Sequence, residues 1–553
     1  MTPQGEAYLE PDLSPVEPET FTGHVDTVGL TALGWDSYDI AWLQDHVWWD
    51  EEDDNKWKVS EANLAFGPNG STPLVWADKA AQKDNPDIVF FPKFTLAPTT
   101  NQNWNGLMSG WRWVCAIPTH GWDTTNVTSF NNLFNSCYNL RSVGDLSEWN
   151  TAKVTGLYCT FNHCDSLRDV GNLNNWNTFK VTTFYYTFYY CISLENIGDV
   201  SNWDTSSCTS FTNMFYLCSS LRHIGDLSGW DISKASSLIN MFYQCNLITS
   251  LGDLSGWNTS KVTNMSNMFY FCHRLTYIGD ISGWDVSNVT TFSSMFNQCI
   301  FLSSVGSLSG WNTSKVTSMN SMFYQCRNLE SLDLTNWDVS SLTGTGLQNM
   351  FTACYVLKSV GDLSNWEVTS NITSLYQMFQ LCRQLRKIGD ISNWDTSNVT
   401  TLGYVFEGCR FLDDVDVSKW NTALVTNFAS AFSVNIHLDT IDISGWDTTS
   451  CTSTASISSS ATNAVVNTCY CTKTIVLGPK FFNSSVSTFY FDRQRSWTRD
   501  SVVESLYTNQ TLRNSSSPAK TVRLWSDVYD SLTQEDISNI SSKNITLVRS
   551  TTA

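Results

Sequence analysis

The chain has 553 residues, and its 32 Lys and Arg against 52 Asp and Glu give a net charge of −20. This charge repels phosphate backbones and anionic lipid surfaces, so nucleic acid is excluded as a favoured partner. Hydrophobic residues make up 42% and charged residues 15%, against roughly 25% charged residues in ordinary domains, which excludes disorder over most of the length. No run approaches the ~18 apolar residues of a membrane helix, so no membrane insertion is expected. The start of the chain lacks the basic and apolar segments of a secretory signal, and if the chain is complete we expect no export through Sec.

The first 121 residues divide into two segments. Residues 1–29 are rich in Pro, Glu and Thr, which predicts an extended arm that orders when it docks onto other proteins of a larger assembly. Residues 30–121 are rich in Trp and predict a compact N-terminal cap domain. Within this cap, Ser37–His46 can form a short amphipathic helical segment, and Val89–Pro92 is typical of an edge strand that Pro stops.

A repeat occupies residues 122–451. Its marker is a Trp at intervals of 27 residues seven times and 26 to 29 residues afterwards: Trp122, Trp149, Trp176, Trp203, Trp230, Trp257, Trp284, Trp311, Trp337, Trp366, Trp394, Trp420 and Trp446. Each interval contains a Phe followed three residues later by Cys, except the last, which has Asn435 instead. In most units two aliphatic residues follow, three and six residues after the Cys. Self-similarity at this period predicts a solenoid, because a ~27-residue unit cannot bury its apolar face alone.

Each unit is predicted to contain a short strand, a turn and a short helical segment. The 26-residue units alternate apolar and polar residues before Trp, as in Leu438–Ile443, which is the period of a strand. Longer units insert one Gly there, such as Gly144, which indicates a β-bulge. Apolar residues spaced by three and four within Val127–Phe134 favour a short helical or 3₁₀ turn. The predicted fold class is an α/β repeat solenoid of about twelve units with a parallel β-sheet face and N- and C-terminal caps.

Residues 452–553 predict a C-terminal cap domain. Thr498 can cap a helix that contains Val502 and Leu506, and Thr533 with Asp536 is typical of a capping box before a second helix. Solenoids need such terminal seals to stay soluble.

The repeat resembles a known family in its pattern F-x-x-C-x-x-L-x-x-[IVL], followed by W-D-x-S-x-V-T-x-M as around Trp257 and Trp284. This pattern is similar to the BspA-type leucine-rich repeats of bacterial surface proteins over residues 122–451, with Trp in place of the usual Pro after the strand. Residues 30–60 and 475–548 resemble the caps that accompany such repeats in gut Bacteroidales and their phages. The resemblance implies a leucine-rich repeat solenoid with a role in surface recognition.

Eleven cysteines form a column at the repeat period: Cys137, Cys164, Cys191, Cys218, Cys245, Cys272, Cys299, Cys326, Cys354, Cys382 and Cys409. Neighbouring thiols one repeat apart lie near the separation that a disulfide tolerates. A parallel stack does not favour the convergent geometry of a disulfide, so we expect these residues to be buried, reduced and to fill a tight corner. Cys469 and Cys471 have no His or second Cys pair at zinc spacing nearby, so no metal site is predicted there.

A second column places an acid four residues before most of the Trp residues: Asp145, Asp199, Asp226, Asp253, Asp280, Asp333, Asp362, Asp390, Asp416 and Asp442. Stacked carboxylates ~5 Å apart repel by ~0.8 kcal/mol in water, which cations or hydrogen-bond donors must offset. One interpretation is a ladder that binds Ca²⁺ or sugar hydroxyls. The alternative, which we favour, is a solvated strand edge whose Asp side chains accept neighbouring hydroxyl or backbone hydrogens.

Catalysis finds little support in the sequence. There is no Gly-x-Ser-x-Gly, phosphate-binding Gly loop or His-Glu-x-x-His motif, and carboxylate pairs are a product of the repeat itself. The Asp or Asn after each Trp is interpreted as turn chemistry, since these side chains bond their own backbone two residues on. We therefore expect no enzyme and no cofactor.

One position in each unit varies freely on a face predicted to be exposed: Ser142, Asp169, Asn196, His223, Ser250, Tyr277, Ser304, Ser331, Ser359, Lys387, Asp414 and Thr440. A fixed scaffold with a variable face is the layout of a recognition surface. The binding residues predicted near its centre are His223, Tyr277, Asp226, Asp253 and Asp280, because an aromatic platform beside carboxylates suits a glycan or a protein.

The function predicted from these features and the resemblance is non-enzymatic adhesion. The leading hypothesis is a virion protein of a phage, in the tail fibre, tail tip or head fibre, that binds a host surface protein or glycan. It would form a homo-oligomer or part of a larger assembly, held to other virion proteins by the arm at residues 1–29. The alternative is a BspA-like adhesin on the bacterial cell surface.

Overall fold

The computed structural model describes residues 104–106, 108–110, 123–138, 140–451, 472–484, 486–491 and 494–550, and the backbone of five short strands before them. The arm at residues 1–29, Ser37–His46, Trp122, Cys469 and Cys471 lie outside the described residues. None of the described helices has the length and apolar character needed to span a bilayer.

The five short strands precede the repeat. β1 (Val47–Asp50) pairs with β2 (Lys56–Val59) in an antiparallel manner, and β3 (Pro73–Val75) pairs in the same way with β4 (Phe90–Pro92). The strand expected at Val89–Pro92 is thus confirmed. β5 (Gln102–Asn103) pairs in parallel with β6 (Val127–Ser129), which belongs to the repeat.

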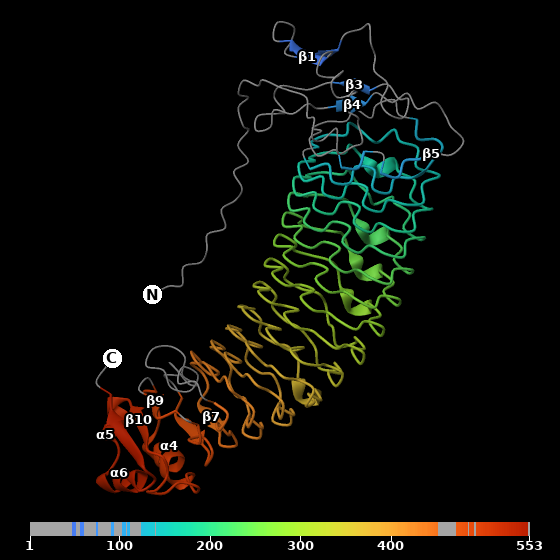
Figure 1. The fold of residues 1–553 in the computed structure, drawn as a ribbon. Helices are drawn as coiled ribbons and strands as arrows, with labels where there is room; N and C mark the ends of the chain where they lie inside the picture. Colours follow the sequence, from blue (N-terminus) through green and yellow to red (C-terminus); the bar gives the residue numbers. More distant parts are fainter. Residues whose placement is uncertain are drawn as a thin grey trace.

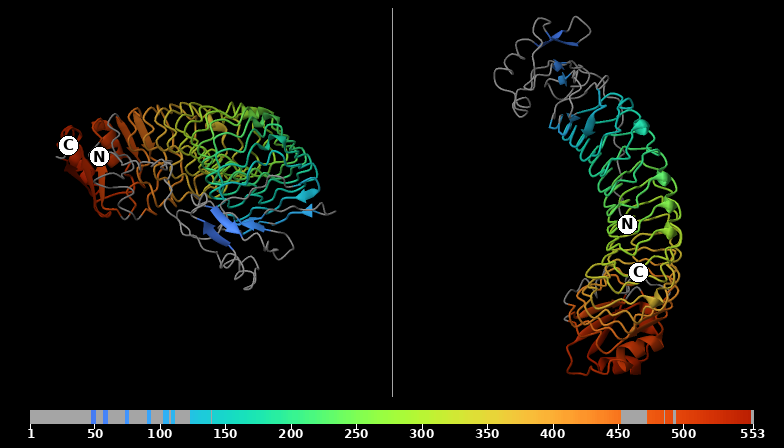
Figure 2. Two further views of the ribbon diagram at one scale, coloured as in Figure 1. Left: turned by 90° about the horizontal axis from the view of Figure 1, so that it is seen from above. Right: turned by 90° about the vertical axis from the view of Figure 1, so that its right-hand side faces the viewer.

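The units that follow stack into one curved solenoid (Figure 1; Figure 2). Backbone hydrogen bonds join each unit to the next: Phe134 donates its N–H to the carbonyl of Thr160 at 2.8 Å, and Phe161 donates to Thr187 at the same distance. These bonds recur one unit apart along the stack, so each unit satisfies its neighbour's backbone. The predicted repeat solenoid is therefore confirmed.

Strand pairing between units is parallel, as predicted, but is mostly limited to single residues. Ser142 bridges Asp169, for example, and similar bridges recur along the stack. In the longer units a Gly with positive φ, such as Gly225 at 89°, ends the extended run two residues after the bridge. The last pair, β7 (Thr440–Ile443) and β8 (Thr474–Leu477), lacks this Gly and forms four paired residues. Within the described units the predicted sheet face is thus reduced to parallel bridges, and a second column of such bridges runs through Ser237, Asn264 and Thr291.

The helical turn predicted for Val127–Phe134 is wrong. Val127–Ser129 is β6, and the residues after it form successive turns in which Asn132 and Ser136 have φ of 55° and 62°. Two such left-handed residues recur in each unit, two positions before and two positions after the repeated Phe. Apolar residues spaced by three and four suit this chain of turns as well as a helix, and the bonds to the next unit take the N–H groups that a helix would use.

Regular 3₁₀ turns occur in five units, just before the repeated Trp. They are η2 (Leu173–Asn175), η3 (Leu227–Gly229), η4 (Leu254–Gly256), η5 (Ile281–Gly283) and η6 (Leu363–Asn365). In the right-hand view of Figure 2 the 3₁₀ turns of the middle units lie along the outer side of the curve.

Two aromatic ladders fill the core. Successive Trp rings stack almost in parallel, as for Trp311 and Trp337, whose centroids are 6.0 Å apart at 3°. Successive Phe rings do the same, as for Phe215 and Phe242 at 5.7 Å and 10°. Most Trp residues also donate Nε1–H to a backbone carbonyl of the preceding unit, such as Trp311 to Ile281 at 3.1 Å. Burial and donor satisfaction together explain why Trp recurs at this position.

The repeated cysteines are buried, as predicted, and each is a free thiol. Each donates its S–H to a backbone carbonyl of the preceding unit, as Cys191 does to Phe161 at 3.0 Å and Cys245 to Phe215 at 3.1 Å. Burial raises the pKa of these thiols well above the usual range. Cys suits the position because it is small and apolar yet retains a weak donor for this carbonyl.

We expect the eleven thiols to react slowly in the native protein. A thiol with a raised pKa and no solvent access forms little of the thiolate that attacks a reagent. Titration with a thiol reagent before and after denaturation checks this, with mass spectrometry to detect disulfides. Fast reaction of most of the eleven without denaturant, or their recovery in oxidised pairs, would contradict the prediction.

The C-terminal region is a small α/β unit. Its parallel sheet has the order β11 (Ile545–Arg549), β10 (Lys520–Leu524), β9 (Thr488–Phe491). The helical elements are α4 (Arg499–Val503), the π-turn η7 (Glu504–Thr508), α5 (Ser526–Asp530) and α6 (Gln534–Ser541).

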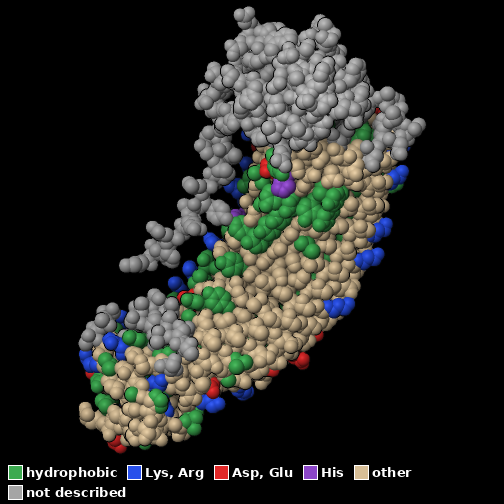
Figure 3. All heavy atoms as spheres, in the orientation of Figure 1, with side chains coloured by type: hydrophobic (Ala, Val, Ile, Leu, Met, Phe, Trp, Pro, Cys, Tyr) green, Lys and Arg blue, Asp and Glu red, His purple; other side chains and the backbone are tan. Residues whose placement is uncertain are grey.

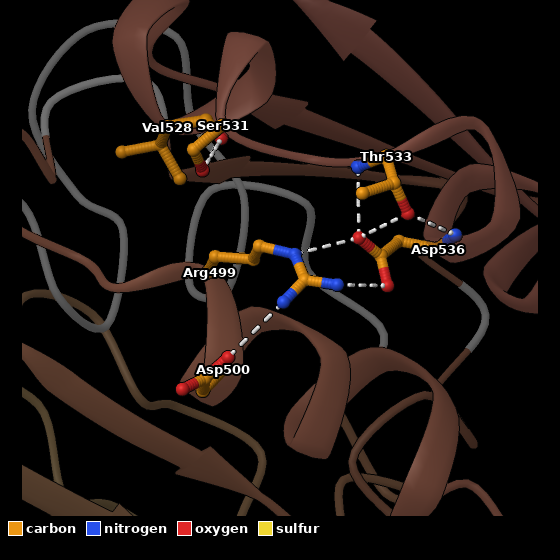
Figure 4. A network of polar contacts seen from close by, with 6 residues as sticks. All are labelled: Arg499, Asp500, Val528, Ser531, Thr533 and Asp536. Carbon is orange, nitrogen blue, oxygen red and sulfur yellow. Dashed lines mark hydrogen bonds and ion pairs between the residues drawn. The ribbon is translucent and has the colours of Figure 1, made fainter.

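Both helix starts that the sequence indicated are present in this region. Thr498 is the residue before α4 but makes no side-chain capping bond, whereas Thr533 and Asp536 form the predicted capping box of α6. Arg499 binds the same carboxylate, with Nε 2.8 Å and Nη2 3.0 Å from Asp536, so α4 and α6 are held together (Figure 4).

α4 and η7 also contact β8, the strand that pairs with β7 at the end of the repeat. The N–H groups of Ile475 and Leu477 in β8 donate to the hydroxyls of Ser501 and Ser505, each at 3.1 Å. The two serine hydroxyls therefore accept from N–H groups of β8 that a further strand would otherwise pair with. Without them, the edge of β8 would offer unpaired donors to another chain.

Candidate functional site

The variable column is exposed throughout. All twelve positions are exposed, whereas the aliphatic residue that follows each bridge is buried in most units. Ser250 and Tyr277, for example, bridge to one another in parallel and leave their side chains to solvent. The buried neighbours fix the backbone, so the exposed side chain can change without changing the fold.

The five predicted binding residues lie on this exposed side in neighbouring units. Tyr277 has half of its surface exposed, and His223, Asp226, Asp253 and Asp280 are also exposed. The three aspartates precede η3, η4 and η5 respectively, so they lie at the start of 3₁₀ turns and not on strands.

The Asp column acts chemically as a series of turn caps. Asp226 accepts a hydrogen bond from the N–H of Ser228 at 2.9 Å, and Asp253 accepts one from Ser255 at 3.0 Å. The same bond from Ser201 lowers the pKa of Asp199, to which the nearby His223 adds a smaller effect. This is the arrangement that the favoured interpretation predicted, in which backbone donors stabilise the stacked carboxylates.

Seven of the ten carboxylates also lie against a Gly of the following unit. A Cβ built on Gly252 would lie 1.8 Å from Oδ1 of Asp226, and one on Gly279 would lie 2.0 Å from Oδ1 of Asp253. Both glycines have positive φ, of 84° and 87°. The inserted Gly of one unit and the Asp of the preceding unit therefore form one contact. The sequence alone did not reveal this link.

Metal binding by the Asp column gains no support from its geometry. Within the described part of the chain, no three His, Cys, Asp or Glu side chains gather as a metal site would require. The turn bonds use one oxygen of each carboxylate, and the other remains available to solvent or a ligand.

A tyrosine stack, which sequence reasoning missed, lies on a different side of the solenoid. Tyr189, Tyr216, Tyr243 and Tyr270 each follow a repeated Phe, and their ring centroids are 4.7, 4.4 and 4.5 Å apart. Partial burial raises the pKa of Tyr189, Tyr216 and Tyr243, so the phenols stay neutral. Figure 3 shows apolar and aromatic side chains gathered on the N-terminal half of the solenoid. The signal was the recurrence of Tyr one residue after Phe, but the sequence did not show that this position is outside the core.

These features define a leucine-rich repeat solenoid with an exposed variable column. A family model described as "Mycoplasma protein of unknown function, DUF285" matches residues 112–223, 169–276, 193–308, 237–366 and 373–468. The matches cover more than half of the chain. The chain therefore belongs to the DUF285 family of BspA-like leucine-rich repeat proteins, as the resemblance implied.

Two solved structures are similar to the chain. One is a leucine rich cell surface protein from Faecalibacterium prausnitzii, with 18% identity and a TM-score of 0.28 over 62% of this chain and 83% of that one. The other is a leucine-rich repeat protein from Bacteroides eggerthii, with 11% identity and a TM-score of 0.18 over 75% and 70%. These TM-scores are too low for either structure to assign a function. The comparison with curated proteins finds no match.

Proposed function

We propose that this protein is a non-enzymatic recognition protein that adheres to a protein or glycan through the exposed variable column of its solenoid. The observation that carries the proposal is the contrast between the column and its surroundings. Its side chains are exposed and range from Ser to Tyr, His and Lys, while the flanking aliphatic, Trp and Cys positions are buried and nearly constant. Membership of the BspA-like family supports the same role.

Tyr277 is the centre of the proposed site. Its side chain is 50% exposed, whereas its neighbours in the column, Ser250 and Ser304, are small. A ring flanked by small residues can be reached by a sugar or an apolar side chain. Asp253 and Asp280 each keep one oxygen free of the turn bond and can accept hydroxyl hydrogens beside the ring. Adhesion measured with and without a chelator tests whether Ca²⁺ on the Asp column contributes.

The protein is proposed to act on a surface, and two locations are compatible with that role. The first, a phage tail fibre, tail tip or head fibre, follows from the resemblance of residues 30–60 and 475–548 to caps found in phages. The second, the bacterial cell surface, follows from the family. Immunogold labelling of induced cultures with an antibody to the solenoid separates them: label on released particles supports the virion, and label on intact cell envelopes supports the adhesin.

We expect the double substitution Tyr277→Ala and Asp253→Asn to weaken adhesion severalfold with a change of melting temperature of only a few degrees. Tyr277 points to solvent, and Asn caps the turn at η4 as well as Asp does. The measurement is binding of the labelled full chain to a panel of intact Bacteroidales cells. Phe179→Ala is the matched control, because Phe179 is 43% exposed but follows Trp in a different turn. Unchanged adhesion in the double variant would refute this site.

A further inference from the structure

A row of cationic side chains crosses four consecutive units in the C-terminal half of the solenoid. The residue after the repeated Cys is Arg327, Tyr355, Arg383 and Arg410 in these units. The guanidinium groups of Arg327 and Arg383, from the units before and after Tyr355, lie 5.6 and 4.4 Å from the centre of its ring. Stacking on the ring holds the two guanidinium planes in place without an anion.

No carboxylate of the described residues neutralises the positive charge of this row. In the described part of the chain, none of Arg327, Arg383 and Arg410 lies within ion-pair distance of a carboxylate, in contrast to Lys358, which pairs with Glu330 at 2.8 Å. The Nε atoms of Arg327 and Arg383 are buried without a hydrogen-bond partner. These Nε atoms cannot reach a ligand, and Nη2 of Arg327 donates to Gln325 at 2.8 Å, so a ligand would contact the remaining Nη groups of a row whose charge no described carboxylate offsets.

The spacing of the row suits a ligand with widely spaced anionic groups. Arg327 and Arg383 lie two units apart, ~10 Å for parallel units, which is about the length of one disaccharide. A nucleic acid carries one charge per ~1.7 Å of duplex, so the acidic remainder of the chain would repel it strongly. A polysaccharide with one acid per disaccharide meets much less of that repulsion.

The surface around the row also favours a polysaccharide over an acidic peptide. Peptides bind mainly through apolar anchors, but no large apolar side chain is exposed between residues 327 and 410, all of which the structure describes. The exposed neighbours are polar: Asn328, Ser331, Ser359 and Gln384. Amides and hydroxyls of this kind pair with the hydroxyls of a sugar chain.

We propose that Arg327 and Arg383, stacked with Tyr355, bind an acidic polysaccharide together with Arg410, and that this chain lies along the solenoid axis. The inference deepens the proposed recognition function, but it uses different residues and different units from the Tyr277 site. Arginine binds carboxylate and sulfate groups through paired N–H donors, so either anion fits the row.

The test measures binding of the full chain to immobilised hyaluronan and heparin, with uncharged dextran and polyglutamate as comparison probes. We expect binding to at least one of the two acidic polysaccharides, weakening as salt is raised because the contacts are electrostatic. The variant R327Q/R383Q/R410Q should bind at least tenfold more weakly. The single variant R410Q, at an exposed side chain, should lose a measurable part of the affinity without affecting folding.

The matched control is K153Q/K234Q/K261Q, which removes the same charge from exposed lysines in other units. It should change the affinity by less than twofold. Equal losses in both triple variants, tighter binding to polyglutamate, or no binding to either acidic polysaccharide would overturn the proposal. Y277A/D253N should bind these polysaccharides normally, so failure of this proposal and failure of the Tyr277 site give different results.

Discussion

Replacing Trp284 with Ala is expected to lower the free energy of unfolding by about 3–5 kcal/mol, the range for removal of a large buried aromatic side chain. Trp284 is 3% exposed and stacks between Trp257 and Trp311, with ring centroids 6.2 and 6.5 Å away. Its Nε1 donates to the carbonyl of Leu254 at 2.9 Å. The substitution leaves a cavity, interrupts the stack of Trp rings at its middle and removes one of the two hydrogen bonds to the Leu254 carbonyl, which still accepts from the N–H of Trp257 at 3.1 Å.

Trp284→Phe separates the two contributions. Phe keeps most of the apolar ring but cannot donate to Leu254, whose carbonyl keeps the N–H of Trp257, so we expect a smaller loss of about 0.5–1.5 kcal/mol from the missing hydrogen bond. Urea denaturation followed by circular dichroism measures both variants. Hydrogen exchange should rise most in the units next to Trp284, because each unit contacts only its neighbours. Unfolding midpoints equal to that of the wild-type protein would contradict the role assigned to the ladder.

The periodic features of the fold could be predicted because they are repeated many times. Trp and Phe face the core in every described unit and Cys in all but the last, and a pattern present in many units indicates burial regardless of local backbone geometry. The turns could not be predicted in the same way. Asn132 and Ser136 adopt positive φ, and nothing in the spacing of apolar residues distinguishes a chain of such turns from a short helix.

The candidate site was predicted in part. The exposure of His223 and Tyr277 follows from their place beside buried aliphatic residues, and the structure places both on one side. The Arg327 row and the tyrosine stack were missed because each extends over only four units, and the row includes Tyr355 among its arginines. Their positions after Cys and after Phe could be read from the sequence, but whether those positions face solvent depends on the turn geometry.

Replacing Gly252 with Ala is expected to destabilise the protein by about 2–3 kcal/mol. The positive φ of 84° costs a residue with a Cβ about 1–2 kcal/mol. The new Cβ would also displace the carboxylate of Asp226 from the N–H of Ser228, and loss of such a cap costs about 1 kcal/mol. Gly256→Ala is the control in the same turn, because Gly256 has no neighbour within 4 Å and no positive φ, and its cost should stay within about 0.5 kcal/mol.

A double-mutant cycle with Asp226→Ala shows whether the Gly and Asp columns are one contact. Asp226→Ala alone should cost about 1 kcal/mol through loss of the cap. In that background the Cβ at position 252 no longer meets a carboxylate, so only the cost of the backbone conformation remains and the double variant should lose less than the sum of the two single losses. The coupling should be about 1 kcal/mol in urea denaturation. Strict additivity would mean that the carboxylate moves aside freely, and that Gly recurs in the longer units for its backbone conformation alone.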